Sequence, residues 1–348
     1  MYKRFFIKFL SLFLTAILIL GGFVFAIDPF NHYRAEEDLT KIIYQMPYYQ
    51  NIGIASYTKY DTLITGSSMT QNFRANLFDK AMNCHAIRLS FDGGIVDDYC
   101  KLIETSTQDN PQLKQIFFGL DNYLITSDSK LLNEIDRIPL YLSDNNILND
   151  VQYLLNKDVV FNYIRTYFAY KFSNTYDFYE MHAWDNGSVH FSAQSVLANY
   201  SSPQKSAPHN EFAFQSSAQY IIDKLSTYIK NYPEIDFILF APPYSILYWH
   251  SILNEGKLNA TIEALRLTYC ELLKFDNVRI FYFQNIPELI TNLDNYKDAT
   301  HYRSTYNEYM LDCFVNGENE ITKDNYVAVL EDMKQLAISY DYDTLLNN

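Results

Sequence analysis

Two short segments near opposite ends of the chain carry the side chains that acyl transfer requires. Ser68 follows Gly66 after a short apolar run, and Asp298 precedes His301 by three residues much later in the chain. A carboxylate at this spacing can accept a hydrogen bond from the imidazole Nδ1, which leaves Nε2 free to take a proton from a serine hydroxyl. A helix N-cap and an Asp-initiated turn are the plainer interpretations of each segment alone. Together the segments predict a serine nucleophile, a general base and an orienting carboxylate.

A second set of residues could stabilise the oxyanion that forms when a serine attacks a carbonyl group. Gly93 follows the second apolar run, and a glycine N–H can approach a ligand closely because glycine has no Cβ. Asp121 and Asn122 follow the third run. A carboxylate repels an oxyanion unless it is protonated or turned away, so Asn122, or the N–H groups of Ser68 and Gly93, are the alternatives. A plain turn and a helix cap explain Gly93 and Asp121 equally well.

Strands and helices that alternate from residue 61 onward must position these groups. Short apolar runs bounded by Gly, Pro, Asn or Asp predict five strands, at residues 62–65, 86–89, 115–118, 236–240 and 278–283. Helical patterns between them predict a three-layer α/β/α sandwich with a mainly parallel five-stranded sheet. Reactive groups in such sheets gather at the carboxyl ends of the strands, where the candidate residues lie. Residues 241–244, which end the fourth run, are expected to shape a pocket wall without a catalytic part.

The long interval between the third and fourth strands predicts an inserted helical cap at about residues 123–233. Trp184, Tyr200 and the pair His182 and His190 would overhang the site as a polymer-binding wall. A surface loop with incidental aromatic residues is the favoured alternative. The two histidines do not have the spacing of a zinc motif.

Composition excludes several classes of protein. The chain has 348 residues, of which 48% are hydrophobic, so it can build a sizeable core and is neither disordered nor a disulfide miniprotein. The chain has only 27 Lys and Arg against 41 Asp and Glu, and its sequence has no basic stripe, so a nucleic-acid partner is not expected. The chain lacks phosphate-binding glycine motifs and Cys-x-x-Cys spacing, so neither a cofactor nor a metal is expected. The sequence leaves two alternatives for the cysteines, a Cys84–Cys100 disulfide or four buried thiols.

The first 27 residues predict a membrane anchor. Lys3, Arg4 and Lys8 accompany the uncharged, mostly apolar residues 9–27, which as a helix would measure about 28 Å, close to the ~30 Å hydrocarbon core. The basic residues predict a cytoplasmic N-terminus and a main domain outside the membrane. A cleavable signal peptide is the alternative, but the run exceeds an apolar region of about 7–15 residues and lacks a clear cleavage site before Asp28.

The expected organisation has three parts. Residues 1–27 form the cytoplasmic tip and transmembrane anchor, residues 28–60 a juxtamembrane connector, and residues 61–348 the α/β domain with its cap. Without the three basic residues of the anchor, the exported part has 24 Lys and Arg and 41 Asp and Glu, so its formal charge is −17. The predicted extracytoplasmic body is therefore strongly acidic, with no second hydrophobic span.

The order of these segments resembles the SGNH (GDSL-like) hydrolase superfamily. The matching blocks, in the family's order, are Gly66-Ser67-Ser68, Gly93, Gly119-Leu120-Asp121-Asn122 and Asp298-Ala299-Thr300-His301. Two positions depart from the family: Ser67 replaces the usual Asp, and Asp121 stands where Asn is usual. An anchored domain outside the membrane further resembles the branch that modifies cell-surface polymers. That branch includes the DltD-like proteins of teichoic acid D-alanylation and the AlgJ- and AlgX-like polysaccharide O-acetyltransferases.

The resemblance implies that Ser68 attacks an ester or thioester carbonyl, with His301 as the base and Asp298 orienting it. The acyl group then passes to a sugar hydroxyl or to water. A cell-surface polysaccharide or a teichoic-acid-like polymer is the implied substrate, and a membrane-bound O-acyltransferase is a candidate partner. The alternative is a catalytically silent, membrane-tethered module that binds a glycan or such an acyltransferase. Asp121 favours the silent module, whereas the retained Ser68, Asp298 and His301 favour the enzyme.

Overall fold

The chain forms two compact units. The computed structural model describes residues 2–34, 41–127, 137–144, 146–173, 177 and 183–347. The N-terminal unit comprises Met1–Lys59 and Asp136–Met181, and the sheet unit comprises Tyr60–Ile135 and His182–Asn348. The residues predicted as a cap are therefore divided, because 136–181 group with the N-terminal segment and the helix before the fourth strand belongs to the sheet unit.

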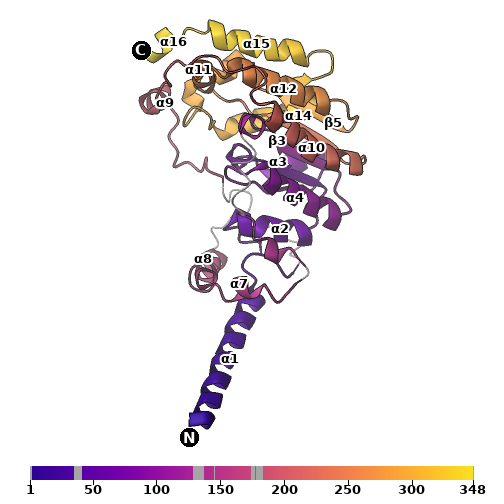
Figure 1. The fold of residues 1–348 in the computed structure, drawn as a ribbon, viewed down its shortest axis with the longest axis vertical. Helices are drawn as coiled ribbons and strands as arrows, with labels where there is room; N and C mark the ends of the chain where they lie inside the picture. The colour runs from indigo at the N-terminus through magenta and orange to yellow at the C-terminus, as the bar shows by residue number, and fades with distance from the viewer. Residues whose placement is uncertain are drawn as a thin grey trace. The chain divides into compact units, whose positions relative to one another are not determined.

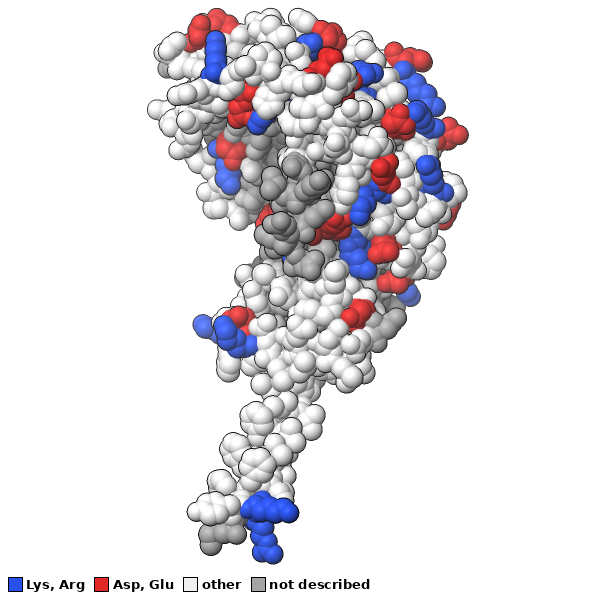
Figure 2. All heavy atoms as spheres, viewed as in Figure 1, with Lys and Arg blue, Asp and Glu red and all other residues white. Residues whose placement is uncertain are grey.

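The N-terminal unit begins with α1 (Tyr2–Ile27), a helix of 26 residues that is long and apolar enough to cross a membrane. Figure 2 shows α1 uncharged except for basic residues near its N-terminal tip. Arg34 closes the other end, because its guanidinium donates to the carbonyl oxygens of Phe25 at 2.7 Å and Ala26 at 2.6 Å. These carbonyls belong to the last turn, where helical partners are missing, and the positive charge also suits the negative end of the helix dipole.

Short helices complete this unit around a small core of its own. They are α2 (Pro47–Tyr57), η3 (Leu140–Leu142), α7 (Val151–Leu154), the π-helical η4 (Val159–Tyr163) and α8 (Ile164–Ser173). The core joins the end of α1 to these segments through Val24, Phe30, Tyr153, Val159 and Ile164. Burial of these side chains is the main favourable term that holds α7 and α8 to the chain that follows α1.

The sheet unit contains a mixed, mostly parallel sheet of six strands, in the order β2-β1-β3-β4-β5-β6. Figure 1 labels two of these strands, β3 and β5, among the helices of the unit. The strands are β1 (Thr62–Thr65), β2 (Ala86–Arg88), β3 (Gln115–Gly119), β4 (Asp236–Ala241), β5 (Val278–Tyr282) and β6 (Glu320–Ile321). The first five pair in parallel, whereas β6 runs antiparallel to β5. The α/β class is confirmed, and the predicted count of five strands is wrong. A strand as short as β6 has no periodicity that a sequence pattern could reveal.

Apolar side chains pack against both faces of β3. Phe117 contacts Phe78 of α3 (Ala75–Met82) and Phe314 of α14 (Ser304–Asn316), with ring centroids 5.0 and 5.3 Å apart. Phe118 contacts Tyr99 of α4 (Val96–Asp109) at 5.1 Å. Neighbouring residues of a strand point to opposite faces, so α3 and α14 pack on one face of β3 and α4 on the other. Such aromatic pairs contribute roughly 0.5–1.5 kcal/mol each beyond the area they bury.

The other helices of this unit extend the packing along the sheet. They are α5 (Asn122–Thr126), α9 (Ala193–Asn199), α10 (Gln215–Asn231), α11 (Ile246–Asn254), α12 (Leu258–Leu272), α13 (Pro287–Ile290), α15 (Tyr326–Ser339) and α16 (Tyr342–Asn347). α10 contacts α4, α5 and α12, and α12 contacts α15. The sheet unit also contains the short 3-10 helices η2 (Ser68–Thr70) and η5 (Leu293–Asn295).

The four cysteines are all free. Cys100 and Cys313 are buried, whereas Cys84 and Cys270 are partly exposed. The Cys84–Cys100 disulfide is therefore not formed, and only two of the four thiols are buried.

Candidate active site

The strand order places the ends of β1 and β3 side by side at one rim. The chain passes from β1 to β2 on one side and then crosses back to β3 on the other side of β1, so the direction of the strand order reverses there. Ligands of open parallel sheets bind outside the carboxyl ends of the strands at such a reversal. Ser68 follows β1, Asp121 follows β3, and the segment with Asp298 and His301 follows β5. The topology therefore brings distant segments of the sequence to the same edge of the sheet.

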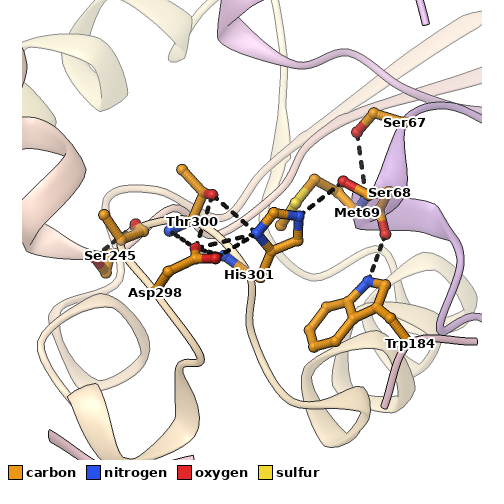
Figure 3. Close-up of polar contacts among 9 residues, drawn as sticks. Ser67, Ser68, Met69, Trp184, Ser245, Asp298, Thr300 and His301 are labelled. Carbon is orange, nitrogen blue, oxygen red and sulfur yellow. Dashed lines mark hydrogen bonds and ion pairs between the residues drawn. The ribbon is translucent and has the colours of Figure 1, made fainter. Parts of the chain in front are cut away.

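Ser68, His301 and Asp298 form a continuous hydrogen-bonded row (Figure 3). The hydroxyl Oγ of Ser68 lies 2.9 Å from Nε2 of His301. On the other side of the ring, Nδ1 lies 2.8 Å from Oδ2 of Asp298. When Nδ1 carries the proton and donates to the carboxylate, Nε2 is left as an acceptor for the serine hydroxyl. The three predicted catalytic residues are thus brought together with the polarity that a general base needs.

Asp298 is held in its ionised form by several donors. Its Oδ1 accepts from the backbone N–H groups of Thr300 and His301, both at 2.9 Å, and from the Thr300 hydroxyl at 3.1 Å. Burial alone would raise the pKa of Asp298, but the hydrogen bonds and charge of His301, aided by the N–H of Thr300, hold that pKa well below its usual range. A carboxylate that stays charged keeps the imidazole oriented and stabilises its protonated form.

The loop that carries these two side chains is fixed at two places. The carbonyl oxygen of Ala299 accepts from the N–H of Ser245 at 3.1 Å and from its hydroxyl at 2.7 Å. Ser245 is also the N-cap of α11. The hydroxyl of Tyr302, a fully buried residue, donates to the carbonyl oxygen of Met69 at 3.0 Å. Because Met69 directly follows Ser68, this bond ties the histidine segment to the serine turn.

The serine turn needs glycine at its start. Gly66 has a φ of +147°, and a Cβ there would lie 2.6 Å from Cγ2 of Thr70 and 3.2 Å from Cα of Gly119. Ser67 then caps η2 by accepting a hydrogen bond at its hydroxyl. The close packing of Gly66 on Thr70 fixes the turn, and Ser68 projects from it partly exposed.

Trp184 forms a wall beside the serine and the histidine. Its indole N–H donates to the carbonyl oxygen of Ser68 at 2.8 Å, and its ring meets that of His301 edge-on, with centroids 5.3 Å apart (Figure 3). Asp185 holds the segment in place by accepting from the N–H of Ser304 at 2.8 Å. The interpretation of this segment as a surface loop with incidental aromatic residues is therefore wrong for Trp184. His182 lies outside the described residues, and Tyr200 hydrogen-bonds His250 of α11 instead.

Asn122 takes part in a buried amide pair. Its Nδ2 donates to Oε1 of Gln284 at 2.9 Å, and Nε2 of Gln284 donates back to its Oδ1 at 3.3 Å. Both residues are fully buried. The pair gives Asn122 a structural explanation, and its part in an oxyanion hole stays a prediction that these contacts do not support.

Asp121 is fully buried and accepts a hydrogen bond from the hydroxyl of Tyr244. Burial raises the pKa of Asp121 to about 6, while hydrogen bonds from Tyr244 and Ser67 and the charge of His301 limit the rise. The carboxyl group therefore changes its charge near pH 6. Below that pH it is neutral and does not repel a nearby oxyanion.

Gly93 and Gly94, which follow β2, are glycines for different structural reasons. Gly93 is exposed and has a φ of +54°, a conformation that other residues rarely adopt. At Gly94, a Cβ would lie 2.5 Å from the hydroxyl oxygen of Tyr99, so this position packs too closely for a side chain. Gly93 shapes the turn, and its role as an oxyanion donor stays a prediction.

Sequence reasoning missed two residues that position the site, Ser245 and Tyr302, and it gave Tyr244 only as part of a pocket wall. Tyr244 and Ser245 follow β4, so the rule that strand ends carry function pointed to their neighbourhood. Tyr302 is adjacent to His301, but nothing in a single sequence shows that its hydroxyl reaches Met69. Among the residues that the structure describes, no group of three or more His, Cys, Asp or Glu side chains could hold a metal ion.

Comparisons of the chain with protein-family models, with curated proteins and with solved structures found no match. The functional interpretation therefore depends on the geometry of the site.

Proposed function

We propose that the protein is a serine-dependent acyltransferase or esterase that works through an acyl-Ser68 intermediate. The observation that carries the proposal is the row in which Nε2 of His301 lies 2.9 Å from Oγ of Ser68 and Nδ1 lies 2.8 Å from Oδ2 of Asp298. A hydrogen-bonded serine, histidine and carboxylate define this class of nucleophilic catalyst on unrelated folds.

The reaction would proceed in two steps. Nε2 of His301 takes the hydroxyl proton as Oγ of Ser68 attacks the carbonyl carbon of an ester or thioester. The bond to the leaving group then breaks, and the leaving group takes the proton from the imidazole. In the second step a sugar hydroxyl or water gives its proton to His301 and attacks the acyl carbon. The bond between that carbon and Oγ of Ser68 then breaks, and Oγ takes the proton back from the imidazole. General acid–base catalysis of this kind contributes roughly 10²–10⁴-fold to a rate.

The oxyanion that forms in each step requires donors, and the family resemblance offers the N–H groups of Ser68 and Gly93 as the candidates. Each donor of an oxyanion hole lowers the barrier by about 2.7–4 kcal/mol. Asp121 contributes by its charge state, because its carboxyl group is neutral below a pKa of about 6.

The proposed fold is the three-layer α/β/α sandwich of the SGNH superfamily. Support comes from the central reversal in strand order, from the packing of helices on both faces of β3, and from the order of the sequence blocks. In this proposal Ser67 stands in place of the family's Asp without moving the nucleophile.

The proposed location is a membrane surface outside the cytoplasm. α1 has the length and apolar composition of a single membrane span, and Lys3, Arg4 and Lys8 favour a cytoplasmic N-terminus. A cell-surface polysaccharide or teichoic-acid-like polymer is the proposed acceptor, with a membrane-bound O-acyltransferase as the candidate donor. Both rest on the family resemblance.

A second candidate is the silent tethered module, which Asp121 favours because it replaces the family's Asn.

Reaction of the full-length protein with a fluorophosphonate probe tests the enzyme proposal. We expect labelling of the wild type and of a control with the exposed Ser339 replaced (Ser339→Ala), and no labelling of Ser68→Ala. Undiminished labelling of Ser68→Ala would remove Ser68 from the nucleophile role. If the wild type hydrolyses p-nitrophenyl acetate no faster than His301→Ala does, the silent module is favoured.

A further inference from the structure

Three apolar side chains beside α7 are turned out of the N-terminal unit. Ile147 is 78% exposed, Leu148 is 82% exposed and Val151 is 48% exposed. Single exposed apolar residues are common on protein surfaces, whereas apolar residues gathered on one short turn and helix call for a partner. We define these three residues as the α7 patch.

α7 is packed onto α1 well before that helix ends. A Cβ on Gly21 would lie 3.8 Å from Cβ of Leu154 and 3.8 Å from Cδ2 of Leu155, so the two segments are in van der Waals contact. Gly21 precedes the helix end at Ile27 by six residues, which is about 9 Å along the axis. If residues 9–27 span the hydrocarbon, this contact lies within the outer part of the bilayer.

Further contacts prevent α7 from moving away from α1. The N–H of Phe30 donates to the hydroxyl oxygen of Tyr153 at 3.3 Å, and their rings stack with centroids 5.7 Å apart. The hydroxyl of Tyr33 donates to Asp150 at 3.1 Å. Both partners lie just past the end of α1. The α7 patch is therefore held beside the helix end by packing as well as by polar contacts.

The turn that carries the patch pairs several of its polar groups internally, although Oδ1 of Asn149 is buried without a hydrogen-bond partner. Oδ1 of Asp144 accepts from the N–H of Asn146 at 2.8 Å, and Oδ1 of Asn146 accepts from the N–H of Leu148 at 3.3 Å. Nδ2 of Asn149 donates to the second carboxylate oxygen of Asp144 at 2.8 Å. Each backbone N–H that is paired in this way lowers the cost of bringing the apolar tips into lipid, and polar side chains suit the headgroup level.

We propose that Ile147, Leu148 and Val151 insert into the lipid interface on the side of the membrane where α1 ends. The inference rests on the membrane anchor proposed above and goes beyond the acyl-transfer chemistry. Lipid is the occupant that the geometry favours, because the patch belongs to a segment that packs through Leu154 and Leu155 on the proposed membrane helix.

Tryptophan fluorescence of the full-length protein in vesicles tests the insertion. Leu148→Trp is reconstituted in phosphatidylcholine vesicles with ordinary or dibrominated acyl chains, and the emission of the native Trp184 and Trp249 is subtracted using the wild type. Leu14→Trp in α1 reports on the anchor, and Val327→Trp on the exposed surface of α15 reports on water-facing sites. Ile147→Trp provides a second probe, and circular dichroism checks that each variant is folded.

We expect the added emission of Leu148→Trp and Ile147→Trp to shift to shorter wavelength and to lose most of its intensity in brominated vesicles. Val327→Trp should show neither change. If Leu14→Trp is quenched and both patch probes are not, insertion of the patch is wrong while the anchor stands. A protein partner on this patch would give the same unquenched result in pure lipid. Absence of quenching at Leu14→Trp, or equal quenching at Val327→Trp, also overturns the proposal. None of these readouts depends on catalysis, so fluorophosphonate labelling of Ser68 judges the enzyme proposal separately.

Discussion

The indole N–H of Trp184 donates to the carbonyl oxygen of Ser68 over 2.8 Å, across 116 residues of chain. The same indole ring meets the imidazole of His301 at an interplanar angle of 87°. One side chain from a distant segment therefore contacts both the nucleophile and the base of the proposed reaction. Trp184 is a positioning residue in this arrangement, because it holds the backbone of Ser68 and limits the rotation of the imidazole.

Substitution of Trp184 separates these two contacts. Trp184→Phe keeps an aromatic ring beside His301 but removes the hydrogen bond to Ser68, whose net contribution should be about 0.5–1.5 kcal/mol. We expect kcat for a model ester to fall about 2–10-fold with KM little changed. Trp184→Ala removes both contacts and should lower kcat further. Equal kcat values for Trp184→Phe, Trp184→Ala and the wild type would show that the contact has no catalytic effect.

Asp298→Asn should abolish most activity without disrupting the loop. The amide keeps the shape of the carboxylate but cannot stabilise the protonated imidazole, and it favours the wrong tautomer of His301. Replacing a triad carboxylate in this way lowers kcat by up to about 10⁴-fold. The control is Asp294→Asn in η5, outside the hydrogen-bonded row. Activity of Asp298→Asn within a few fold of the wild type would contradict the role of Asp298 as the orienting group.

The same carboxylate makes stability depend on pH. Because the folded pKa of Asp298 lies below its unfolded value of about 3.9, its contribution is fully present above that value and is lost as the pH falls toward the folded pKa. We expect wild-type protein to unfold at higher urea concentration than Asp298→Asn at pH 7. The difference should shrink steadily below pH 4. A difference independent of pH from 7 to 3 would show that the charge of Asp298 does not stabilise the fold.

The elements that carry the proposed nucleophile were predictable because their local signals are strong. β1 spans Thr62–Thr65, as its short apolar run predicts, and a glycine turn with Ser68 follows directly. β3 extends one residue beyond its prediction, to Gly119. Short runs of β-branched and aromatic residues between turn residues are typical of buried parallel strands, so both strands could be placed without tertiary information.

Contacts between distant segments could not be predicted in the same way. The position of Trp184 against Ser68 depends on how residues 183–191 fold back, and no periodicity encodes that path. The buried pairs of Asn122 with Gln284 and of Asp121 with Tyr244 depend on side-chain directions beyond the ends of β3, β4 and β5. The sequence placed Asp121, Asn122 and Tyr244 at the strand ends, but it did not point to Gln284. Only the packed structure shows which of them pair with each other.

Gly66→Ala should destabilise the protein because the turn before the serine has no space for a methyl group. The new Cβ would lie 2.6 Å from Cγ2 of Thr70 in a backbone conformation with positive φ. Overpacking costs about 1–3 kcal/mol and the backbone strain about 1–2 kcal/mol more. Gly187→Ala is the matched control, since its φ is +83° but nothing lies within 4 Å of the added Cβ. Urea unfolding should therefore give a clearly larger loss for Gly66→Ala. Equal losses would mean that the contact with Thr70 relaxes without cost.

Asp121→Asn should stabilise the protein at alkaline pH. Burial raises the folded pKa of Asp121 from 3.8 to about 6, so the folded state favours the neutral carboxyl group. Stability from this group is full below pH 4 and is lost as the pH rises through 6, by roughly 3 kcal/mol for a rise of about two pKa units.

The amide is neutral at every pH and can still accept from Tyr244, so we expect Asp121→Asn to unfold at higher urea concentration than the wild type at pH 8. The two proteins should become equal in stability below pH 4.

The variant also restores the residue type that the SGNH resemblance expects at this position. If the carboxylate repels the oxyanion, ester hydrolysis by Asp121→Asn should exceed that of the wild type above pH 6, with the gap closing at lower pH. A variant less stable than the wild type at pH 8 would show that the ionised carboxylate is compensated by Tyr244 and Ser67. The raised pKa would then be wrong, and with it the neutral charge state that we assign to Asp121 below pH 6.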